Sequence, residues 1–225
     1  MSFNWSYSSI KTFQQCPKKY YHLKVAKDVK DEGSEATIYG QELHKAAEDY
    51  IQSDTPIPPQ FAFMQDLLDS LKKIPGEKHC ELKLGIAIRE GKYVACDFFA
   101  KDVWWRGIAD LVIINGDTAY SVDYKTSKNA KYADTKQLDL VASAIFTHFP
   151  QVKTIKSGLL FVISKDFIKK DHSSDFRTAY IEHFKFDIER IDMATKTGVW
   201  NAVSGPLCGY CPVKTCHNYR ERKTR

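Results

Sequence analysis

The chain has 225 residues, of which 43% are hydrophobic and 27% are charged, and its formal net charge is +5. This composition is typical of a globular protein with a hydrophobic core. The absence of any run of about 18 apolar residues excludes a transmembrane helix, and the polar N-terminus lacks the apolar stretch of a signal peptide. We therefore expect one domain over residues 1–225, no membrane partner, and a cytoplasmic location in a bacterium, an archaeon or a phage-infected host cell.

The net charge limits the kinds of partner, and the cysteine content bears on whether the protein contains disulfides. The excess of basic residues permits a polyanionic partner without requiring one. The basic tail His217–Arg225 is either a solvated terminus or a contact to a phosphate backbone. The six cysteines of a cytoplasmic protein are expected to be thiols or metal ligands, because that compartment disfavours disulfides.

Helical patterns open the chain. Apolar residues at helical spacing predict helices from about Ser8 to Lys24, from Ala36 to Tyr50 and from Phe61 to Lys73. The proline-rich segment Ser53–Gln60 predicts a loop between the second helix and the third.

Alternating patterns then predict a meander of strands, namely Cys80–Ile88, Tyr93–Ala100, Val103–Ile114 and Thr118–Thr126. The dipeptide Asn-Gly before the fourth strand is a strong hairpin signal. After these come a helix, two strands and a last helix, at about Ala133–Phe149, Ser157–Ser164, Thr178–Phe186 and Ile188–Asn201. This order indicates a mixed α/β domain in which helices flank a central sheet.

The predicted hairpin brings three charged residues to one face. A two-residue turn at Asn115 and Gly116 would place Asp110 opposite Ser121. Because side chains alternate along a strand, Asp110, Asp123 and Lys125 then project from the same face.

Two adjacent carboxylates on a largely apolar face repel each other and are costly to bury. A hard divalent cation such as Mg²⁺ or Mn²⁺ would relieve both problems. Lys125 could then stabilise negative charge that develops on a phosphate, or orient the attacking water. The alternative is a plain Asp–Lys ion pair at the end of the sheet, with Asp110 solvated.

A second cluster closes the folded part of the chain. Cys208, Cys211 and Cys216 form a C-x2-C-x4-C pattern, which needs one more thiolate to complete a four-ligand site. Such a set suits either Zn²⁺ or an iron–sulfur cluster. Cys80 and Cys96 lie in strand patterns and are expected to be buried and unreactive.

Taken in order, six segments resemble the PD-(D/E)XK nuclease superfamily, and in particular its RecB-like branch, which includes CRISPR-associated and AddB-type iron–sulfur nucleases. The segments share the order of that family's motifs, and they are SYSSIKTFQQCPKKYYHLK at Ser6–Lys24, GQELH at Gly40–His44, GIAD at Gly107–Asp110, VDYKTS at Val122–Ser127, KQLDLVASAIF at Lys136–Phe146 and CGYCPVKTC at Cys208–Cys216. The resemblance covers nearly the whole chain and implies a restriction-endonuclease-like core.

The resemblance also implies roles for individual residues. It implies that His44, Asp110 and Asp123 bind Mg²⁺ or Mn²⁺ together with the backbone carbonyl of Tyr124. It further implies that Lys125 is catalytic and that Gln137 supports the active site. The family usually has a tyrosine four residues after this glutamine, where this chain has Val141.

For the cysteines, the resemblance implies a structural [4Fe–4S] cluster that joins the N- and C-terminal segments. Its ligands would be Cys16, Cys208, Cys211 and Cys216, with Zn²⁺ as the other occupant of the site.

The function implied is a metal-dependent DNA nuclease, and a compact chain of this kind suggests an exonuclease in recombination, repair or phage DNA processing. Its DNA would be single-stranded or carry single-stranded ends, and any helicase or recombination partner would be a separate protein. Two alternatives remain open: a non-catalytic DNA-binding module with a degenerate nuclease fold, and a redox-active iron–sulfur protein. At the residue level, His44 could instead be a packing residue, and Glu81 is expected to be solvated although it could approach the site. The sequence leaves the oligomeric state undetermined.

Overall fold

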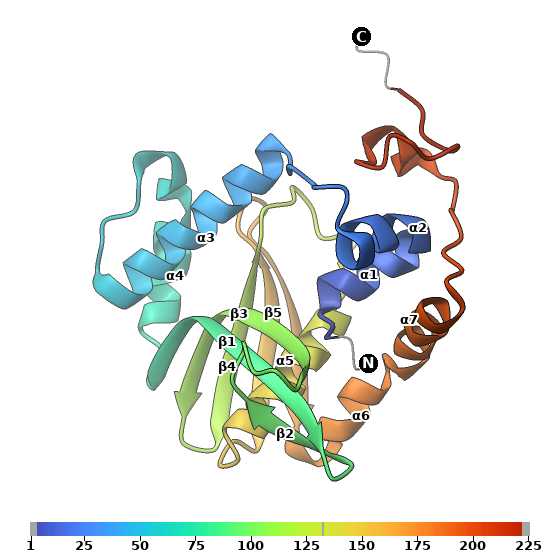
Figure 1. Ribbon diagram of the computed structural model, residues 1–225. Coiled ribbons are helices and arrows are strands. Elements are labelled where there is room, and N and C mark those ends of the chain that lie inside the picture. Colours follow the sequence, from blue (N-terminus) through green and yellow to red (C-terminus); the bar gives the residue numbers. More distant parts are fainter. Residues whose placement is uncertain (1–3, 132, 222–225) are drawn as a thin grey trace. The chain divides into compact units, whose positions relative to one another are not determined.

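The computed structural model describes residues 4–131 and 133–221. The chain divides into two compact units. The larger contains Ser34–Glu182 and is called the sheet unit below; the smaller contains Trp5–Gly33 and the segment from His183 onward and is called the terminal unit. Figure 1 shows both units, with the strands of the sheet coloured from green to orange.

A mixed sheet forms the centre of the sheet unit. Its six described strands are β1 (Glu77–Arg89), β2 (Lys92–Cys96), β3 (Val103–Asn115), β4 (Thr118–Lys125), β5 (Thr154–Phe161) and β6 (Asp166–Ser173), and they lie in the order β2-β1-β3-β4-β5-β6. Strands β4 and β5 are parallel and the other neighbours antiparallel. Helix α5 (Lys136–His148) provides the crossover between the parallel pair. The predicted mixed α/β architecture is confirmed.

Helices α3 (Glu35–Ser53) and α4 (Gln65–Lys72), with the 3-10 turn Pro59–Met64 between them, pack on one face of the sheet. Ser34 caps α3 by accepting a hydrogen bond from the Thr37 N–H. The apolar residues of α3 meet those of β3 and β4 in a common core, for example Leu43, Leu111 and Val122. This packing fixes the rotation of α3, and therefore the direction in which its polar residues point.

The turn between β3 and β4 lies one residue later than predicted. Asn115 pairs with Thr118, so the two central residues are Gly116 and Asp117 rather than Asn115 and Gly116. Gly116 has a φ of +62° whereas Asp117 is not among the positive-φ residues, which is the pattern of a type II′ turn with glycine first. The predicted pairing of Asp110 with Ser121 is therefore wrong.

The segment Thr178–Phe186, predicted as a strand, is helical. Helix α6 spans Arg177–Glu182 and α7 begins at Lys185. The buried residues Ile181 and Phe184 are three apart, which places them on one side of a helix but on opposite faces of a strand. The strand that pairs with β5 is instead β6, whose mainly polar sequence DFIKKDHS carries no alternating apolar signal because it lies at the sheet edge.

The terminal unit contains α1 (Tyr7–Gln15), α2 (Pro17–Tyr20), a π-helical turn (Tyr21–Ala26), α7 (Lys185–Thr197) and a 3-10 turn (Pro206–Tyr210). The single helix predicted over Ser8–Lys24 is interrupted at Cys16, which is extended. Pro17 cannot donate the hydrogen bond that would continue α1, and it starts α2 instead. Residues 222–225 of the basic tail lie outside the described residues.

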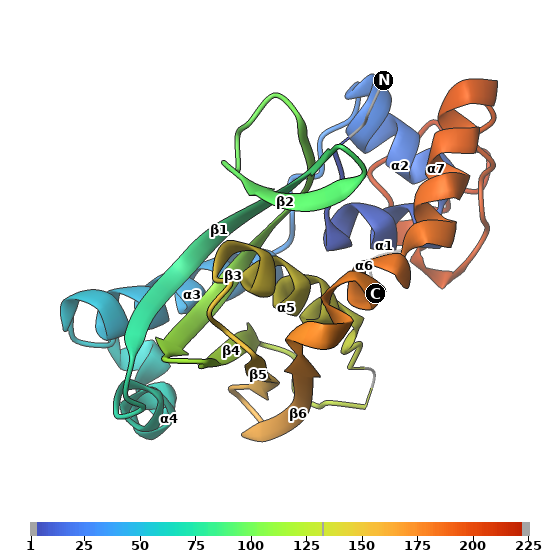
Figure 2. The ribbon, with the colours of Figure 1, turned by 90° about the horizontal axis from the view of Figure 1, so that it is seen from below.

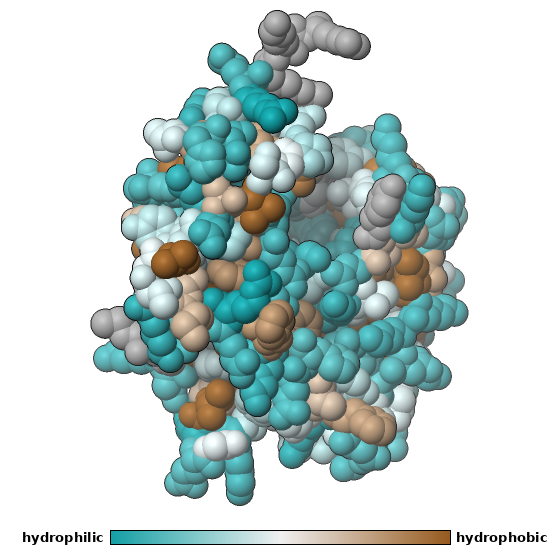
Figure 3. All heavy atoms as spheres, turned by 90° about the vertical axis from the view of Figure 1, so that its right-hand side faces the viewer, coloured by the Kyte–Doolittle hydropathy of each residue, from teal (hydrophilic) through white to brown (hydrophobic). Residues whose placement is uncertain are grey.

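The described part of the chain contains no helix long and apolar enough to cross a membrane. On the face drawn in Figure 3, hydrophilic residues predominate and apolar ones are scattered among them.

Candidate active site

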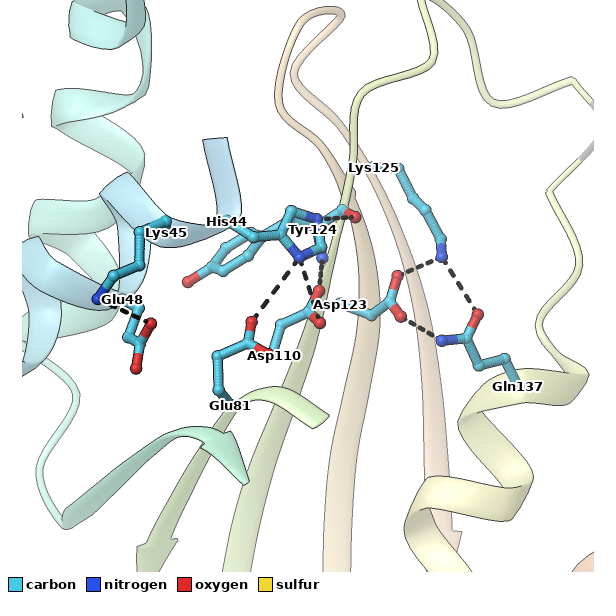
Figure 4. A network of polar contacts seen from close by, with 9 residues as sticks. All are labelled: His44, Lys45, Glu48, Glu81, Asp110, Asp123, Tyr124, Lys125 and Gln137. Carbon is cyan, nitrogen blue, oxygen red and sulfur yellow. Dashed lines mark hydrogen bonds and ion pairs between the residues drawn. The ribbon is translucent and has the colours of Figure 1, made fainter. Parts of the chain in front are cut away.

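Helix α3 directs His44 at the end of β4. The His44 Nε2 atom lies 3.2 Å from the backbone carbonyl oxygen of Tyr124. Its Nδ1 atom lies 3.5 Å from a carboxylate oxygen of Asp110 and 3.9 Å from one of Glu81. Figure 4 shows the imidazole between these groups. The side chain is therefore turned toward two carboxylates and one backbone carbonyl, which come from three strands, an environment unlike that of an apolar packing residue.

Asp110 and Asp123 lie where β3 and β4 begin to separate. The last paired residues are Leu111 and Val122, so the next positions in this register are the two aspartates, directly across from each other. Asp110 Oδ2 accepts a 2.8 Å hydrogen bond from the Tyr124 N–H. This bond occupies one oxygen of Asp110 and leaves the other facing His44.

Asp123, Lys125 and Gln137 form a closed polar group beside the two aspartates. Gln137, from the first turn of α5, donates from Nε2 to Asp123 Oδ1 at 2.5 Å. Lys125 donates from Nζ to Gln137 Oε1 at 3.1 Å and lies 2.6 Å from Asp123 Oδ2. Helix α5 thus fixes both charged residues of the D-x-K segment, as Figure 4 shows.

Glu81 approaches from β1, contrary to the expectation that it is solvated. It lies between the pairs Cys80–Leu111 and Leu82–Ala109, which puts it beside Asp110. Its φ of +48° is unusual for a glutamate inside a strand. The one feature of the sequence that points to Glu81 is an acidic side chain on the strand next to Asp110, and this is a weak signal.

Crowding of negative charge shifts the acid–base properties of this group. Burial and the charge of Asp110 raise the pKa of Asp123 to about 6. Burial and Asp110 likewise raise the pKa of Glu81. Burial alone would lower the pKa of His44, but the hydrogen bond and charge of Asp110, together with the charges of Asp123 and Glu81, outweigh it and raise that pKa. The charge of Asp110 contributes to all three shifts, and a cation would relieve this concentration of negative charge.

The donor atoms suit a hard divalent cation. His44, Glu81 and Asp110 each offer one ligand atom, and these atoms lie within 4.8 Å of one another. Carboxylate, carbonyl and imidazole donors suit Mn²⁺, and the oxygen donors suit Mg²⁺. Asp123 stands just outside this compact group, but its buried Oδ2 has no hydrogen bond of good geometry within the described residues, although Lys125 is near. The residues present therefore fit a divalent ion.

A polar cleft of about 430 Å³ opens beside the site. One helical stripe of α3 lines most of it, and Glu81 completes the wall; the stripe comprises Thr37, Gly40, Gln41, His44, Lys45 and Glu48. The site is thus accessible to a substrate. Val141, which replaces the family tyrosine on α5, is buried and presents no polar group to it.

The terminal unit gathers four cysteines around one cavity of about 210 Å³, whose walls include Cys16, Cys208, Cys211 and Cys216. Backbone N–H groups of Val203 and Gly205 donate to the sulfurs of Cys16 and Cys208, each at 3.4 Å. Within the described residues, no three of the cysteine sulfurs lie within 4.8 Å of one another, so they do not form a compact site for a single ion. The four cysteines share the wall of one cavity, and two of them accept N–H hydrogen bonds, but the described residues show no assembled metal cluster site.

The other two cysteines lie in the sheet unit. Cys80 and Cys96 are half-buried rather than fully buried. Burial raises the pKa of the Cys80 thiol to about 11 and also raises that of Cys96, so both are expected to stay protonated and unreactive.

Comparisons with known proteins identify the family and the fold of the chain. A family model described as the PD-(D/E)XK nuclease superfamily matches residues 4–216. No curated protein matches the chain. A crystal structure named "Putative exonuclease" from Eubacterium rectale aligns over 98% of this chain and 89% of that one, with a TM-score of 0.54 and 13% identity, which shows a shared fold. The crystal structure of SSO0001 aligns over 96% and 87% of the two chains with 13% identity, but its TM-score of 0.40 carries no argument.

Proposed function

Because this chain belongs to the PD-(D/E)XK nuclease superfamily, we propose that it is a divalent-metal-dependent exonuclease that hydrolyses the phosphodiester bonds of DNA. One observation carries this proposal. His44, Asp110 and the Tyr124 carbonyl converge from three separate elements, and Lys125 stands beside them, tied to Asp123. An Asp–Lys ion pair with a purely structural role would not need His44 or the third carboxylate, that of Glu81, beside it.

In this proposal His44, Asp110, Asp123 and the Tyr124 carbonyl hold the ion, and Glu81 adds a carboxylate from β1. When bound, a divalent ion supplies Lewis acidity and makes water a better nucleophile at neutral pH. The ammonium group of Lys125 offsets negative charge on the phosphate as it grows in the transition state. Gln137 holds that ammonium group and the Asp123 carboxylate in place, so it acts as a positioning residue.

We also propose that Cys16, Cys208, Cys211 and Cys216 hold a structural [4Fe–4S] cluster, with Zn²⁺ as the less favoured occupant. Their common cavity and the N–H···S hydrogen bonds support a cluster larger than one ion.

The family match runs through both units, which supports our proposal that they act as a single domain. Recombination, repair or phage DNA processing would use such an enzyme, and a separate helicase or recombination partner would supply single-stranded ends.

The direct test is cleavage of end-labelled linear DNA, single- and double-stranded, in Mg²⁺ or Mn²⁺. We expect products that shorten progressively from an end, no cleavage in EDTA, and resistance of circular single-stranded DNA. Cleavage of the circle would show endonuclease action. DNA binding without any cleavage in either metal would indicate the non-catalytic module instead.

A sharper prediction concerns Glu81. We expect Glu81→Gln to weaken Mn²⁺ binding roughly 10- to 100-fold, the range found when groups around a metal ligand are lost, because one carboxylate of the compact group disappears. Isothermal titration calorimetry measures this without cleavage. The matched control is Glu77→Gln, at an exposed end of the same strand, where the side chain is 76% exposed. Equal Mn²⁺ affinity in wild type and Glu81→Gln would remove Glu81 from the ligand set.

A further inference from the structure

One face of β3 is partly exposed to solvent in the residues that precede Asp110. Trp105 and Ala109 point to the buried side, whereas Ile108 on the other side is 41% exposed. Because side chains alternate, Arg106 and Ile108 share the face of Asp110. Lys83 of β1 is the cross-strand neighbour of Ile108, so it lies on the same face.

Two phenylalanines of the loop between β2 and β3 lie over this face. The Lys83 Nζ atom is 5.6 Å from the centre of the Phe99 ring, and the Arg106 guanidinium is 5.5 Å from that of Phe98. The two rings meet edge to face with centres 5.0 Å apart. Phe99 is 70% exposed. Figure 2 shows the green loop that carries them rising above the β1–β2 hairpin.

Exposed aromatic rings next to basic side chains are the elements that bind single-stranded nucleic acid. Rings stack on bases, and cations contact the phosphates. The exposed ring of Phe99 meets this need, with the half-buried ring of Phe98 against it, and Lys83 and Arg106 provide the charges. In a duplex the bases are already stacked on each other and offer no free face to a phenylalanine, so this chemistry favours a single strand over a duplex.

The position of these residues connects them to the proposed active site. Arg106 precedes Asp110 by four residues on β3, which is roughly 13 Å along an extended strand. At a spacing of about 3.4 Å per nucleotide in a stacked strand, this distance covers roughly four nucleotides. A strand that follows β3 from Arg106 would reach the carboxylates within this length.

We propose that Lys83, Phe98, Phe99, Arg106 and Ile108 form a binding track for single-stranded DNA that leads to the site of Asp110. This inference rests on the proposed nuclease function and adds the residues that hold the single strand and its route to the site. The track holds a few nucleotides next to the cleaved bond, by stacking on the rings and by phosphate contacts to the two cations.

The test measures binding apart from cleavage. Fluorescence anisotropy of a labelled 20-nucleotide thymidine strand in EDTA reports affinity when no metal is available for hydrolysis. We expect Phe99→Ala to weaken binding roughly 5- to 150-fold, the range for one base stacked on an aromatic side chain. Phe176→Ala is the matched control, because Phe176 is 60% exposed elsewhere in the sheet unit, and it should change nothing.

Two further variants separate stacking from general apolar contact. Phe99→Trp should retain or improve the affinity, whereas Phe99→Leu should behave like Phe99→Ala.

The phosphate contacts are tested by salt dependence. Lys83→Gln and Arg106→Gln should each reduce the slope of log K against log salt by about one. A blunt duplex of the same length should bind Phe99→Ala and wild type alike.

The outcomes divide cleanly. Unchanged single-strand affinity in Phe99→Ala, full affinity in Phe99→Leu, an equal loss on the duplex, or no binding of the single strand by wild type would each overturn the track. None of these results touches the proposed function, which is decided by cleavage of labelled DNA in Mn²⁺. If wild type binds the single strand in a Phe99-dependent way but does not cleave DNA in Mn²⁺, the nuclease proposal is overturned and the binding track still holds.

Discussion

Replacement of Lys125 by methionine is expected to lower the rate of DNA cleavage by roughly 10²- to 10³-fold, the loss typical of removing one preorganised group that stabilises transition-state charge. Methionine keeps much of the length of the side chain and removes only the ammonium group. That group lies 2.6 Å from Asp123 Oδ2 and 3.1 Å from Gln137 Oε1. It is therefore fixed beside the carboxylates before any substrate arrives.

The same change should not weaken metal binding, and this separates Lys125 from Asp123. Asp123→Asn removes a charge of the proposed ligand set, so Mn²⁺ affinity should fall along with cleavage. Calorimetry with Mn²⁺ and single-turnover cleavage distinguish the two variants. Lys128→Met, at an exposed position just after β4, is the control and should retain full activity. Full activity in Lys125→Met, or equal Mn²⁺ affinity in wild type and Asp123→Asn, would contradict the proposed roles.

The sequence alone predicted the face of the hairpin although it misplaced the turn. The predicted turn opposed Asp110 to Ser121, and the observed register opposes it to Asp123, a shift of two residues. Because side chains in a strand repeat every two residues, such a shift changes the partner but not the face. The same-face grouping of Asp110 and Asp123 was therefore predictable from local pattern, whereas their direct pairing depended on the turn type.

Features that depend on long-range contacts could not be predicted in this way. Glu81 reaches Asp110 and His44 only because α3 and β1 both pack beside the middle of β3, and its positive φ could not be predicted from the residue type. Strand β6 was missed because an edge strand with one open side need not alternate apolar residues. The segment around Ile181 and Phe184 was mistaken for a strand because it is short and rich in aromatic residues, although the spacing of its two buried residues is helical.

The break between α1 and α2 at Cys16 is caused by the next residue, Pro17, and it places Cys16 near cysteines from the other end of the chain. A proline following the cysteine ends α1, which leaves Cys16 in extended conformation at the wall of the cavity shared with Cys208, Cys211 and Cys216. The sequence supplied the Cys-Pro pair, but the cavity exists only because the last segment of the chain folds back on the first within the terminal unit.

Removal of Cys16 should therefore have a large and local effect. We expect anaerobically purified wild type to be brown, with about four iron and four acid-labile sulfide ions per chain, and Cys16→Ala to lose most of both. A link between Cys16 and the cysteines near residue 210 closes a loop of nearly the whole chain, and by analogy with a disulfide its loss removes roughly 4–5 kcal/mol of stability. Cys208→Ala should lower the thermal midpoint by the same amount, because it opens the same link.

The effect should be confined to one part of the molecule. Hydrogen exchange in Cys16→Ala should increase within Trp5–Gly33 and from His183 onward, while the strands of Ser34–Glu182 stay protected. Cys96→Ala, a half-buried thiol of β2 that does not line the cavity, is the control and should keep its iron. Stoichiometric zinc without iron or sulfide in anaerobic wild type would assign the four thiolates to a single zinc ion. Unchanged metal content in Cys16→Ala would instead take Cys16 out of the ligand set and leave the link between the two ends of the chain to packing alone.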